Sequence, residues 1–283
     1  MDLERHLICP ICRGALFKEA SSLKCERGHS YDFSKSGYIN LLNPGKKNNA
    51  KAGDSKEMIR ARSDFFLSGA YSKINEELCK IVSSFSPKFI VDAGCGDGYY
   101  TLSLAKDNQD AVVFGFDMSK FGAEHASRSA RGAKVTSTLF SVSNIFDMPL
   151  KDSCADVIVN MFAPVASEEF SRVLKPNGYL IVGASGKSHL DGLKRAIYDE
   201  VYLNEPSEHS YEGFDFIECR TLKYDVTITG NDTIQSLFQM TPYYHRTSLK
   251  DKEKLTLISS VSTTIEVDFL IFKSKKEIDY EIY

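Results

Sequence analysis

A stretch of ten residues, 91–100, constrains the fold of this 283-residue chain more than any other part of its sequence. A short apolar run predicts a buried strand that ends at Asp92, and a turn with three glycines and a helical run, 99–106, follow it. In α/β sheets this order presents backbone N–H groups and a helix N-terminus to a nucleotide-like ligand. The sequence therefore predicts an α/β fold with such a ligand at the end of this strand.

The spacing of the glycines distinguishes between two kinds of ligand. A dinucleotide-binding turn requires the pattern G-x-G-x-x-G, but Tyr99 stands at the last glycine position. The pattern present, Asp92-x-Gly94-x-Gly96-x-Gly98, resembles motif I of the S-adenosylmethionine-dependent methyltransferases. A glycine-rich turn that binds no ligand is the remaining alternative.

Strands and helices alternate after this turn. A second strand, 112–117, ends at Asp117, whose carboxylate would accept hydrogen bonds from both hydroxyls of a ribose. The alternative is that Asp117 only caps the helix after it. A third strand is expected at 134–140, and the loop after it contains Asn144. In methyltransferases of this pattern, that loop flanks the adenine.

The exit of the fourth strand is expected at the methyl-transfer face, because ligands meet the carboxyl ends of parallel strands. This exit is residues 160–164, Asn-Met-Phe-Ala-Pro. It resembles the substrate motif of base N-methyltransferases only loosely, since their Asn-Pro-Pro-aromatic sequence is absent. A fifth strand up to Gly183 and two late strands, 222–228 and 263–272, complete the predicted sheet.

A second constellation near the N-terminus predicts a metal site. Cys9, Cys12, Cys25 and His29 have the spacing C-x2-C-x12-C-x3-H. Two close pairs of soft or borderline ligands suit a tetrahedral Zn²⁺ that is closed on all sides, and so a structural ion without a catalytic position. Disulfides are the competing interpretation, but the N-terminus lacks the apolar core of an export signal.

Charge is distributed unevenly along the chain, whose net charge is −3. The first 62 residues contain twelve Lys and Arg against seven Asp and Glu, which leaves −8 for the remainder. A basic segment in front of an acidic one suggests that the first segment meets a polyanion, although a solvated basic face is the alternative. No apolar run approaches the length of a membrane span, and a cytoplasmic location is expected.

The aromatic segment 30–42 either stacks on bases or packs the metal module against the larger part of the chain, and packing is favoured. Residues 43–53 are polar, basic and rich in turn formers, and Asp54-Ser55 then begins an amphipathic helix. We therefore expect a zinc-binding domain at 1–45, a basic linker and helix at 46–75, and a methyltransferase domain at 76–283.

Four sequence blocks accompany the zinc spacing. They are Phe33-x3-Gly37-Tyr38-x-Asn40-Leu41-Leu42, Gly53-Asp54-Ser55-x-Glu57-Met58-x2-Ala61-Arg62, Gly94-Cys95-Gly96-x-Gly98-Tyr99-Tyr100-Thr101 and Met240-Thr241-Pro242. In this combination the chain resembles the bacterial 23S ribosomal RNA guanine-N1 methyltransferases over nearly its whole length.

The resemblance implies a Rossmann-like class I methyltransferase sheet with a small N-terminal zinc-ribbon-like domain, S-adenosylmethionine as the methyl donor and one structural Zn²⁺. It implies that N1 of a guanine in a 23S rRNA hairpin is the acceptor, that the zinc domain takes part in RNA recognition, and that the chain forms a homodimer. It also implies cofactor contacts at Tyr71, Gly96, Asp97 and His189, and Asp97 stands where glutamate is common in the family. The complete predicted cofactor set is Tyr71, Asp92, Gly94, Gly96, Asp97, Gly98, Asp117, Asn144 and His189.

The catalytic base is not identified by the sequence. N1 of guanine carries a proton that must leave, and a guanine inside a stem must be unpaired or flipped out to react. The enzyme would mainly align N1, methyl and sulfur. Asp97, Asn160 and His189 are candidates for accepting the proton by position only.

Two other functional classes remain open. A methyltransferase for small molecules or for another RNA would use the zinc module structurally, but the basic first 62 residues argue against a small-molecule acceptor. An RNA-binding module without catalysis is the second alternative, and the intact glycine turn and Asp117 argue against it.

Overall fold

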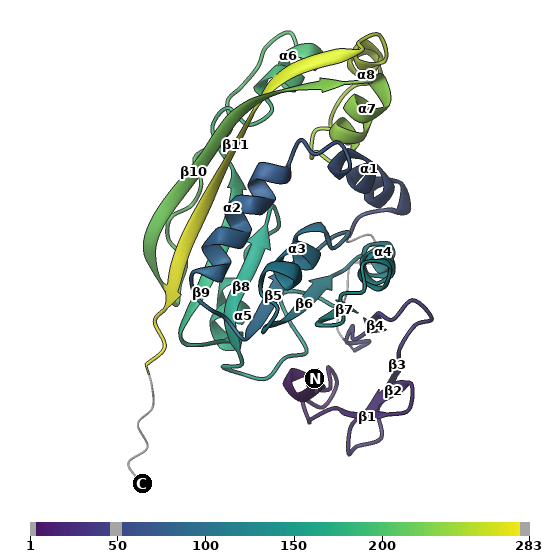
Figure 1. The fold of residues 1–283 in the computed structure, drawn as a ribbon, viewed down its shortest axis with the longest axis vertical. Coiled ribbons are helices and arrows are strands. Elements are labelled where there is room, and N and C mark those ends of the chain that lie inside the picture. Colours follow the sequence, from purple (N-terminus) through teal and green to yellow (C-terminus); the bar gives the residue numbers. More distant parts are fainter. Residues whose placement is uncertain (1–3, 46–52, 278–283) are drawn as a thin grey trace.

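In the computed structural model, which describes residues 4–45 and 53–277, an eight-stranded mixed sheet forms the centre of the molecule (Figure 1). Its strand order is β10-β11-β9-β8-β5-β6-β7-β4, with parallel pairing from β9 to β4 and antiparallel pairing at β11 and β10. The chain order reverses between β5 and β8, so a crevice for a ligand is expected outside the carboxyl ends of these two strands. The predicted Rossmann-like fold class is confirmed.

The strands of this sheet are β4 (Ile39–Asn40), β5 (Phe89–Ala93), β6 (Val112–Asp117), β7 (Thr138–Val142), β8 (Ala155–Met161), β9 (Leu174–Ser185), β10 (Phe214–Thr229) and β11 (Ser260–Ser274). The helices are α1 (Lys56–Phe66), α2 (Ser72–Ser83), α3 (Tyr99–Asp107), α4 (Lys120–Gly132), α5 (Ser167–Val173), α6 (Asp191–Ile197), α7 (Asn231–Gln239) and α8 (Leu249–Thr256).

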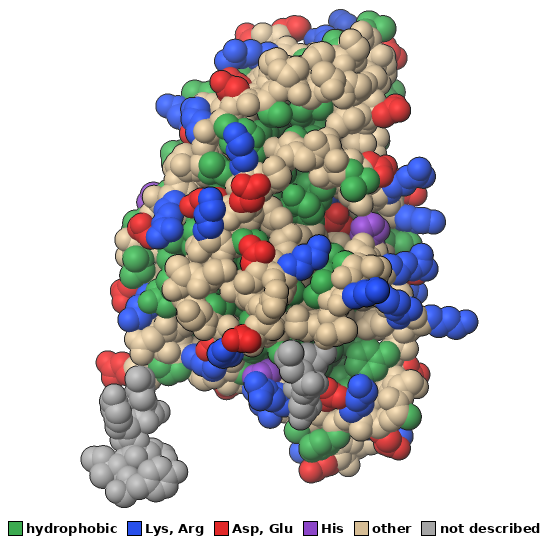
Figure 2. Space-filling view, in the orientation of Figure 1, with side chains coloured by type: hydrophobic (Ala, Val, Ile, Leu, Met, Phe, Trp, Pro, Cys, Tyr) green, Lys and Arg blue, Asp and Glu red, His purple; other side chains and the backbone are tan. Residues whose placement is uncertain are grey.

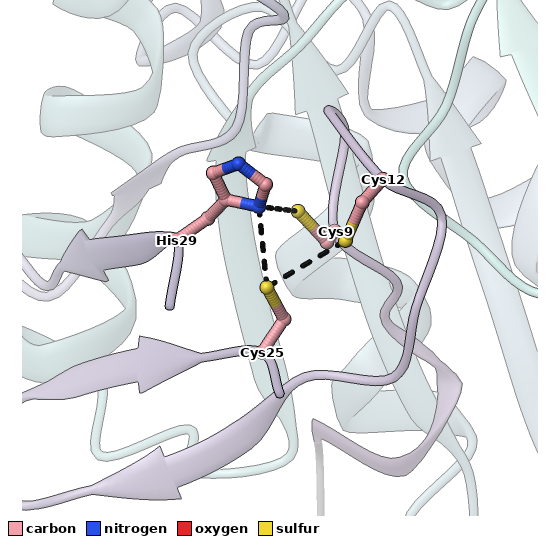
Figure 3. Close-up of side chains that lie close together, drawn as sticks. All are labelled: Cys9, Cys12, Cys25 and His29. Carbon is pink, nitrogen blue, oxygen red and sulfur yellow. Dashed lines mark hydrogen bonds between the residues drawn. The ribbon is translucent and has the colours of Figure 1, made fainter. Parts of the chain in front are cut away.

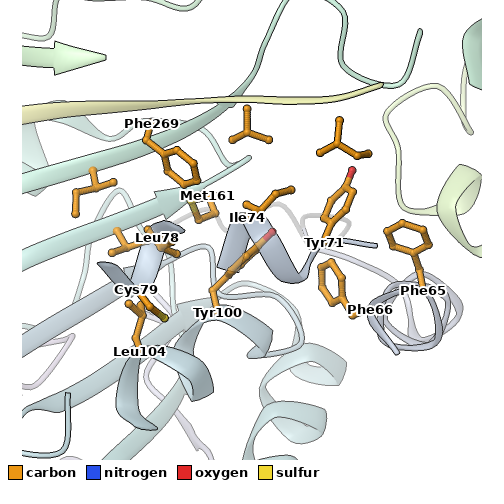
Figure 4. Packing of buried hydrophobic residues seen from close by; sticks show 14 of the residues in the cluster. Phe65, Phe66, Tyr71, Ile74, Leu78, Cys79, Tyr100, Leu104, Met161 and Phe269 are labelled. Carbon is orange, nitrogen blue, oxygen red and sulfur yellow. The ribbon is translucent and has the colours of Figure 1, made fainter. Parts of the chain in front are cut away.

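Both faces of the central strands are buried, which explains their continuous apolar runs. On β5, Ile90 contributes to a core formed with α1, α2, α3, α6, α7 and α8. Its neighbours Phe89 and Val91 contribute to a second core on the opposite face, with α5 and the N-terminal residues. Figure 4 shows part of the first core, where Ile74 and Leu78 of α2 lie near Tyr100 of α3 and Phe269 of β11.

The N-terminal residues are joined to the main sheet. The 3-10 turn η1 (Glu4–His6) is followed by a three-stranded antiparallel sheet of β1 (Phe17–Glu19), β2 (Ser22–Lys24) and β3 (Ser30–Asp32). The His6 ring stacks on Phe89 with 4.1 Å between centroids, and β4 extends the main sheet beside β7. Tyr38, in the aromatic segment, is buried against residues of α4. The packing interpretation of this segment is confirmed by that burial.

Several elements differ in extent from the prediction. The third strand begins at Thr138 rather than residue 134, because Lys134 adopts a left-handed conformation (φ 56°) after α4. The two late strands are longer than expected, and α7 and α8 lie in a region for which no helix was predicted. Over residues 4–45 and 53–277, no helix combines the length and apolarity that crossing a bilayer would require.

Candidate functional site

Three cysteines and a histidine converge between two turns of the N-terminal module. The ligand atoms of Cys9, Cys12, Cys25 and His29 all lie within 4.8 Å of one another (Figure 3). Nδ1 of His29 is 3.5 Å from Sγ of Cys9 and 3.3 Å from Sγ of Cys25, and the sulfurs of Cys12 and Cys25 are 3.6 Å apart. Tetrahedral Zn²⁺ bonds of ordinary length place such atoms about 3.5–3.8 Å apart. The donor set and its spacing therefore fit one closed Zn²⁺ site.

Backbone hydrogen bonds hold each ligand pair in a tight turn. Cys9 N–H donates to the carbonyl of Gly14, and Gly28 N–H donates to the carbonyl of Cys25, with Gly28 in the left-handed region at φ 83°. Burial alone would raise the pKa of Cys9, but hydrogen bonds from the Tyr31 hydroxyl and nearby N–H groups lower that pKa to about 6. The thiolate that a metal requires is thus favoured at neutral pH.

The glycine turn directly follows β5 and leads into α3, as its sequence predicted, and the structure places it at the reversal of strand order between β5 and β8. Gly94, Gly96 and Gly98 all have positive φ, and Gly98 leads into α3. A Cβ on Gly94 would lie 2.6 Å from Cβ of Ala163, just beyond β8, and a Cβ on Gly98 would lie 2.6 Å from Cβ of Ala126 in α4. Larger residues are therefore excluded both by backbone conformation and by close packing.

Three buried carboxylates surround this turn. Burial raises the pKa of Asp97 and of Asp117, and it raises the pKa of Asp92 to about 7. One oxygen of Asp92 accepts a hydrogen bond from Thr101, while the other is buried without a partner. Burial is opposed most strongly at Asp97 by the charge of Arg62 on α1, which lowers the pKa of that carboxyl, and more weakly by a backbone hydrogen bond and by His125. Few positive charges in the protein offset these buried carboxylates, so the cluster fits a cationic ligand. S-Adenosylmethionine carries positive charge at its sulfonium and amino groups and would suit it.

Asp117 ties the turn to the next helix. Its two carboxylate oxygens accept hydrogen bonds from the N–H of Gly96 (2.9 Å) and of Ser119 (2.7 Å). A carboxylate has about four acceptor positions, so capacity for two ribose hydroxyls remains. Asp117 is therefore held at the mouth of the turn by backbone groups. The helix-cap role is filled by Ser119, whose hydroxyl accepts the Gly122 N–H of α4.

The segment before α1 closes over the same loop. Arg62 forms an ion pair with Asp54 (2.6 Å), and its Nη1 lies 2.5 Å from the position that a Cβ on Gly96 would occupy. The hydroxyl of Ser119 donates to the carbonyl of Asp54. These contacts place a guanidinium directly above the glycine turn. The sequence block that contains Arg62 was recognised, but no role was predicted for this residue.

Tyr71 and His189 form a buried pair beside this loop. The Tyr71 hydroxyl lies 3.0 Å from Nε2 of His189, and Nδ1 of His189 accepts the backbone N–H of Glu266. The proton therefore belongs on Nε2, which donates to Tyr71. Burial, followed by the charge of Lys194, lowers the pKa of His189 to about 4, so the ring is neutral at pH 7.

Asn160 and Asn144 lie at the carboxyl end of the sheet, and their side chains hydrogen-bond mainly to nearby backbone groups. Asn160 donates through Nδ2 to the carbonyl of Ala93 (2.9 Å), and its Oδ1 is buried without a partner. Asn144 accepts the N–H of Phe146 and so stabilises the turn after β7. The structure thus brings the nine predicted cofactor residues to the carboxyl ends of the parallel strands and their flanking segments. The hydrogen bond from Thr101 to Asp92 was not predicted from the sequence.

Comparison with known proteins agrees with this geometry. A family model described as "Methyltransferase domain" matches residues 86–239, and one described as "RlmA, N-terminal" matches residues 7–51. The 23S rRNA (guanine(748)-N(1))-methyltransferase of Streptomyces fradiae is 32% identical over 201 residues, which cover 69% of this chain and 69% of that protein. A Bacillus subtilis protein with a provisional name as a 23S rRNA (guanine-N(1)-)-methyltransferase is 27% identical over 281 residues, covering 93% and 95% of the two chains.

Proposed function

This chain belongs to the family of 23S rRNA guanine-N1 methyltransferases, and from that premise we propose that it methylates N1 of a guanine in a hairpin of 23S rRNA. S-Adenosylmethionine is the proposed methyl donor. One observation supports this donor above all: three buried carboxylates converge on a glycine turn at the reversal of strand order, where a cationic nucleoside fits.

The proposed cofactor contacts use the nine residues predicted from the sequence. The turn of Gly94, Gly96 and Gly98 allows close approach of the ligand to the backbone, and Asp117 would accept the ribose hydroxyls while its backbone hydrogen bonds hold it in place. Asp92 and Asp97 supply negative charge, and Asn144 lies beside the expected adenine position. The Tyr71–His189 pair would border the methionine end of the ligand.

In the proposed reaction, the bound cofactor supplies a methyl group on a positively charged sulfur with a neutral thioether as leaving group. The protein's task is to hold the guanine N1 in line with that methyl group and to exclude water. His189 does not accept the N1 proton, because its one lone pair accepts the Glu266 N–H. The amide of Asn160 is not basic. Of the three candidates, Asp97 is the ionisable acceptor that remains, with solvent as the alternative.

We retain the domain division of 1–45, 46–75 and 76–283 as a proposal about roles. The N-terminal module would bind one structural Zn²⁺ through Cys9, Cys12, Cys25 and His29 and would help to recognise RNA. Figure 2 shows Lys and Arg side chains along the edge of the molecule formed by α1 and α4. Exposed members of these helices are Lys56, Arg60, Lys120, Arg128 and Arg131. The two helices contact the glycine turn through Arg62 and through Gly122 and Ala126, so RNA phosphates bound along them would bring a nearby base to the site.

A ribosomal substrate places the proposed activity in the cytoplasm, and no membrane partner is proposed. The homodimer that the resemblance implies is likewise a proposal, and sedimentation velocity of the purified protein tests it. A single species of 31.7 kDa across micromolar concentrations would contradict it.

Transfer of a labelled methyl group from S-adenosylmethionine tests the proposed function. The purified protein is incubated with unmodified 23S rRNA, and nuclease digestion followed by mass spectrometry identifies the methylated nucleoside. We expect 1-methylguanosine within one hairpin. Methylation of another base atom would refute the acceptor, and transfer only to small molecules would favour the other class of methyltransferase.

A further inference from the structure

Phe162, the first residue after β8, combines an unfavourable backbone conformation with an exposed ring. Its φ is 54°, in the left-handed region that bulky side chains avoid, and its N–H donates to the carbonyl of Gly183. The side chain nevertheless remains 42% exposed. Such backbone strain persists only where the surrounding structure imposes it, and it concentrates at functional sites.

Leu190 provides a comparison within the same region. It has a similar φ of 58°, but its side chain is 2% exposed and belongs to the main hydrophobic core. Burial of apolar surface therefore offsets the strain at Leu190. No comparable burial offsets the strain at Phe162, so the position of its ring requires another explanation.

The location of Phe162 supplies that explanation. The next residue, Ala163, lies against Gly94 of the glycine turn, which places Phe162 at the carboxyl end of β8 beside the proposed cofactor site. Its ring is inclined by 28° to the ring of His189, with 6.0 Å between centroids. His189 is itself buried, whereas Phe162 beside it is partly exposed.

We propose that Phe162 is the surface on which the target guanine stacks. This inference rests on the proposed function and specifies how the site holds its substrate. A flipped-out base loses its stacking neighbours, and a flat aromatic ring beside the methyl donor replaces one of them. The left-handed conformation turns the chain at the end of β8 and leaves the ring partly exposed beside His189.

A tryptophan at this position reports stacking directly, because the chain contains no Trp. In Phe162→Trp, we expect the indole emission to be quenched when a 23S rRNA hairpin is added in the presence of S-adenosylhomocysteine. Phe216→Trp is the matched control, since Phe216 is 40% exposed on β10, and its emission should not change. Quenching by S-adenosylhomocysteine alone, with no further effect of RNA, would make Phe162 a cofactor contact and overturn the proposal.

Activity measurements provide a second test. Stacking on an aromatic ring contributes roughly 5- to 150-fold to binding of a base, so Phe162→Ala should lower kcat/KM for the hairpin within this range. Phe162→Tyr should retain most of the activity, and both variants should bind S-adenosylhomocysteine as the wild type does. Equal kcat/KM for wild type and Phe162→Ala would overturn the stacking role.

Phe162→Gly separates substrate stacking from a structural role. Glycine adopts positive φ without strain, so this variant should have an unchanged or higher Tm while its kcat/KM falls as in Phe162→Ala. A lower Tm that accounts for lost activity would show that the ring serves folding instead. If the wild-type protein itself transfers no methyl group to RNA, the proposed function fails as well; if it does, and the Phe162 variants behave like the control, only the stacking role fails.

Discussion

Replacement of Asp117 by alanine should weaken cofactor binding strongly. Two charge-assisted hydrogen bonds to ribose hydroxyls would be lost, each contributing about 1.5–3 kcal/mol. Their combined loss corresponds to a rise of roughly 100-fold or more in Kd for S-adenosylhomocysteine, which isothermal titration calorimetry measures. A change below about threefold would refute the ribose assignment.

The same substitution should also lower stability, because it leaves the buried N–H groups of Gly96 and Ser119 without their acceptor. Each such group costs about 1–3 kcal/mol, so chemical denaturation should show a loss of roughly 2–6 kcal/mol in the free energy of unfolding. Asp117→Asn keeps one acceptor oxygen, so its loss in the free energy of unfolding should be smaller than its loss in the free energy of cofactor binding. Asp110→Ala is the control, because the Asp110 side chain is 89% exposed. It should leave the free energy of unfolding and the Kd for S-adenosylhomocysteine unchanged.

Three further predictions follow from the metal and cofactor sites. Cys9→Ser should reduce bound zinc from about one ion per chain to nearly none by atomic emission, and full retention of zinc would contradict the ligand assignment. The depressed pKa of His189 means that its contribution to stability is complete above pH 6.5 and is lost as pH falls toward 4. His189→Gln should therefore flatten the acid side of the stability profile by up to about 3 kcal/mol, and an unchanged profile would contradict a neutral buried ring. Gly94→Ala places a Cβ 2.6 Å from that of Ala163 and should abolish cofactor binding, which calorimetry measures. Normal binding would show that the turn tolerates a side chain.

The sequence predicted those features that short-range patterns encode. The zinc ligands were recognisable because two close pairs of metal-binding residues have a restricted spacing. The glycine turn was recognisable because three glycines and an acid directly follow an apolar run. In both cases the residues that act together are neighbours in the chain, and the structure brings them together as expected.

Features that depend on distant contacts were not predicted. Arg62 reaches Gly96 only because α1 packs across the glycine turn, and the pairing of β4 with β7 depends on the fold of the whole sheet. The conformation of Phe162 was not predicted either, since a phenylalanine after a strand does not indicate a positive φ. Long-range packing, rather than local propensity, decides these positions.

Methyl transfer into 23S rRNA by the wild-type protein tests the central claim most directly. The reaction contains S-adenosylmethionine with a labelled methyl group, and Asp117→Ala serves as the matched variant with impaired cofactor binding. We expect 1-methylguanosine in one hairpin with the wild type and at least about a 100-fold lower rate with the variant at low cofactor concentration. Failure of the wild type to label guanine N1, or equal labelling by both proteins, would contradict the account.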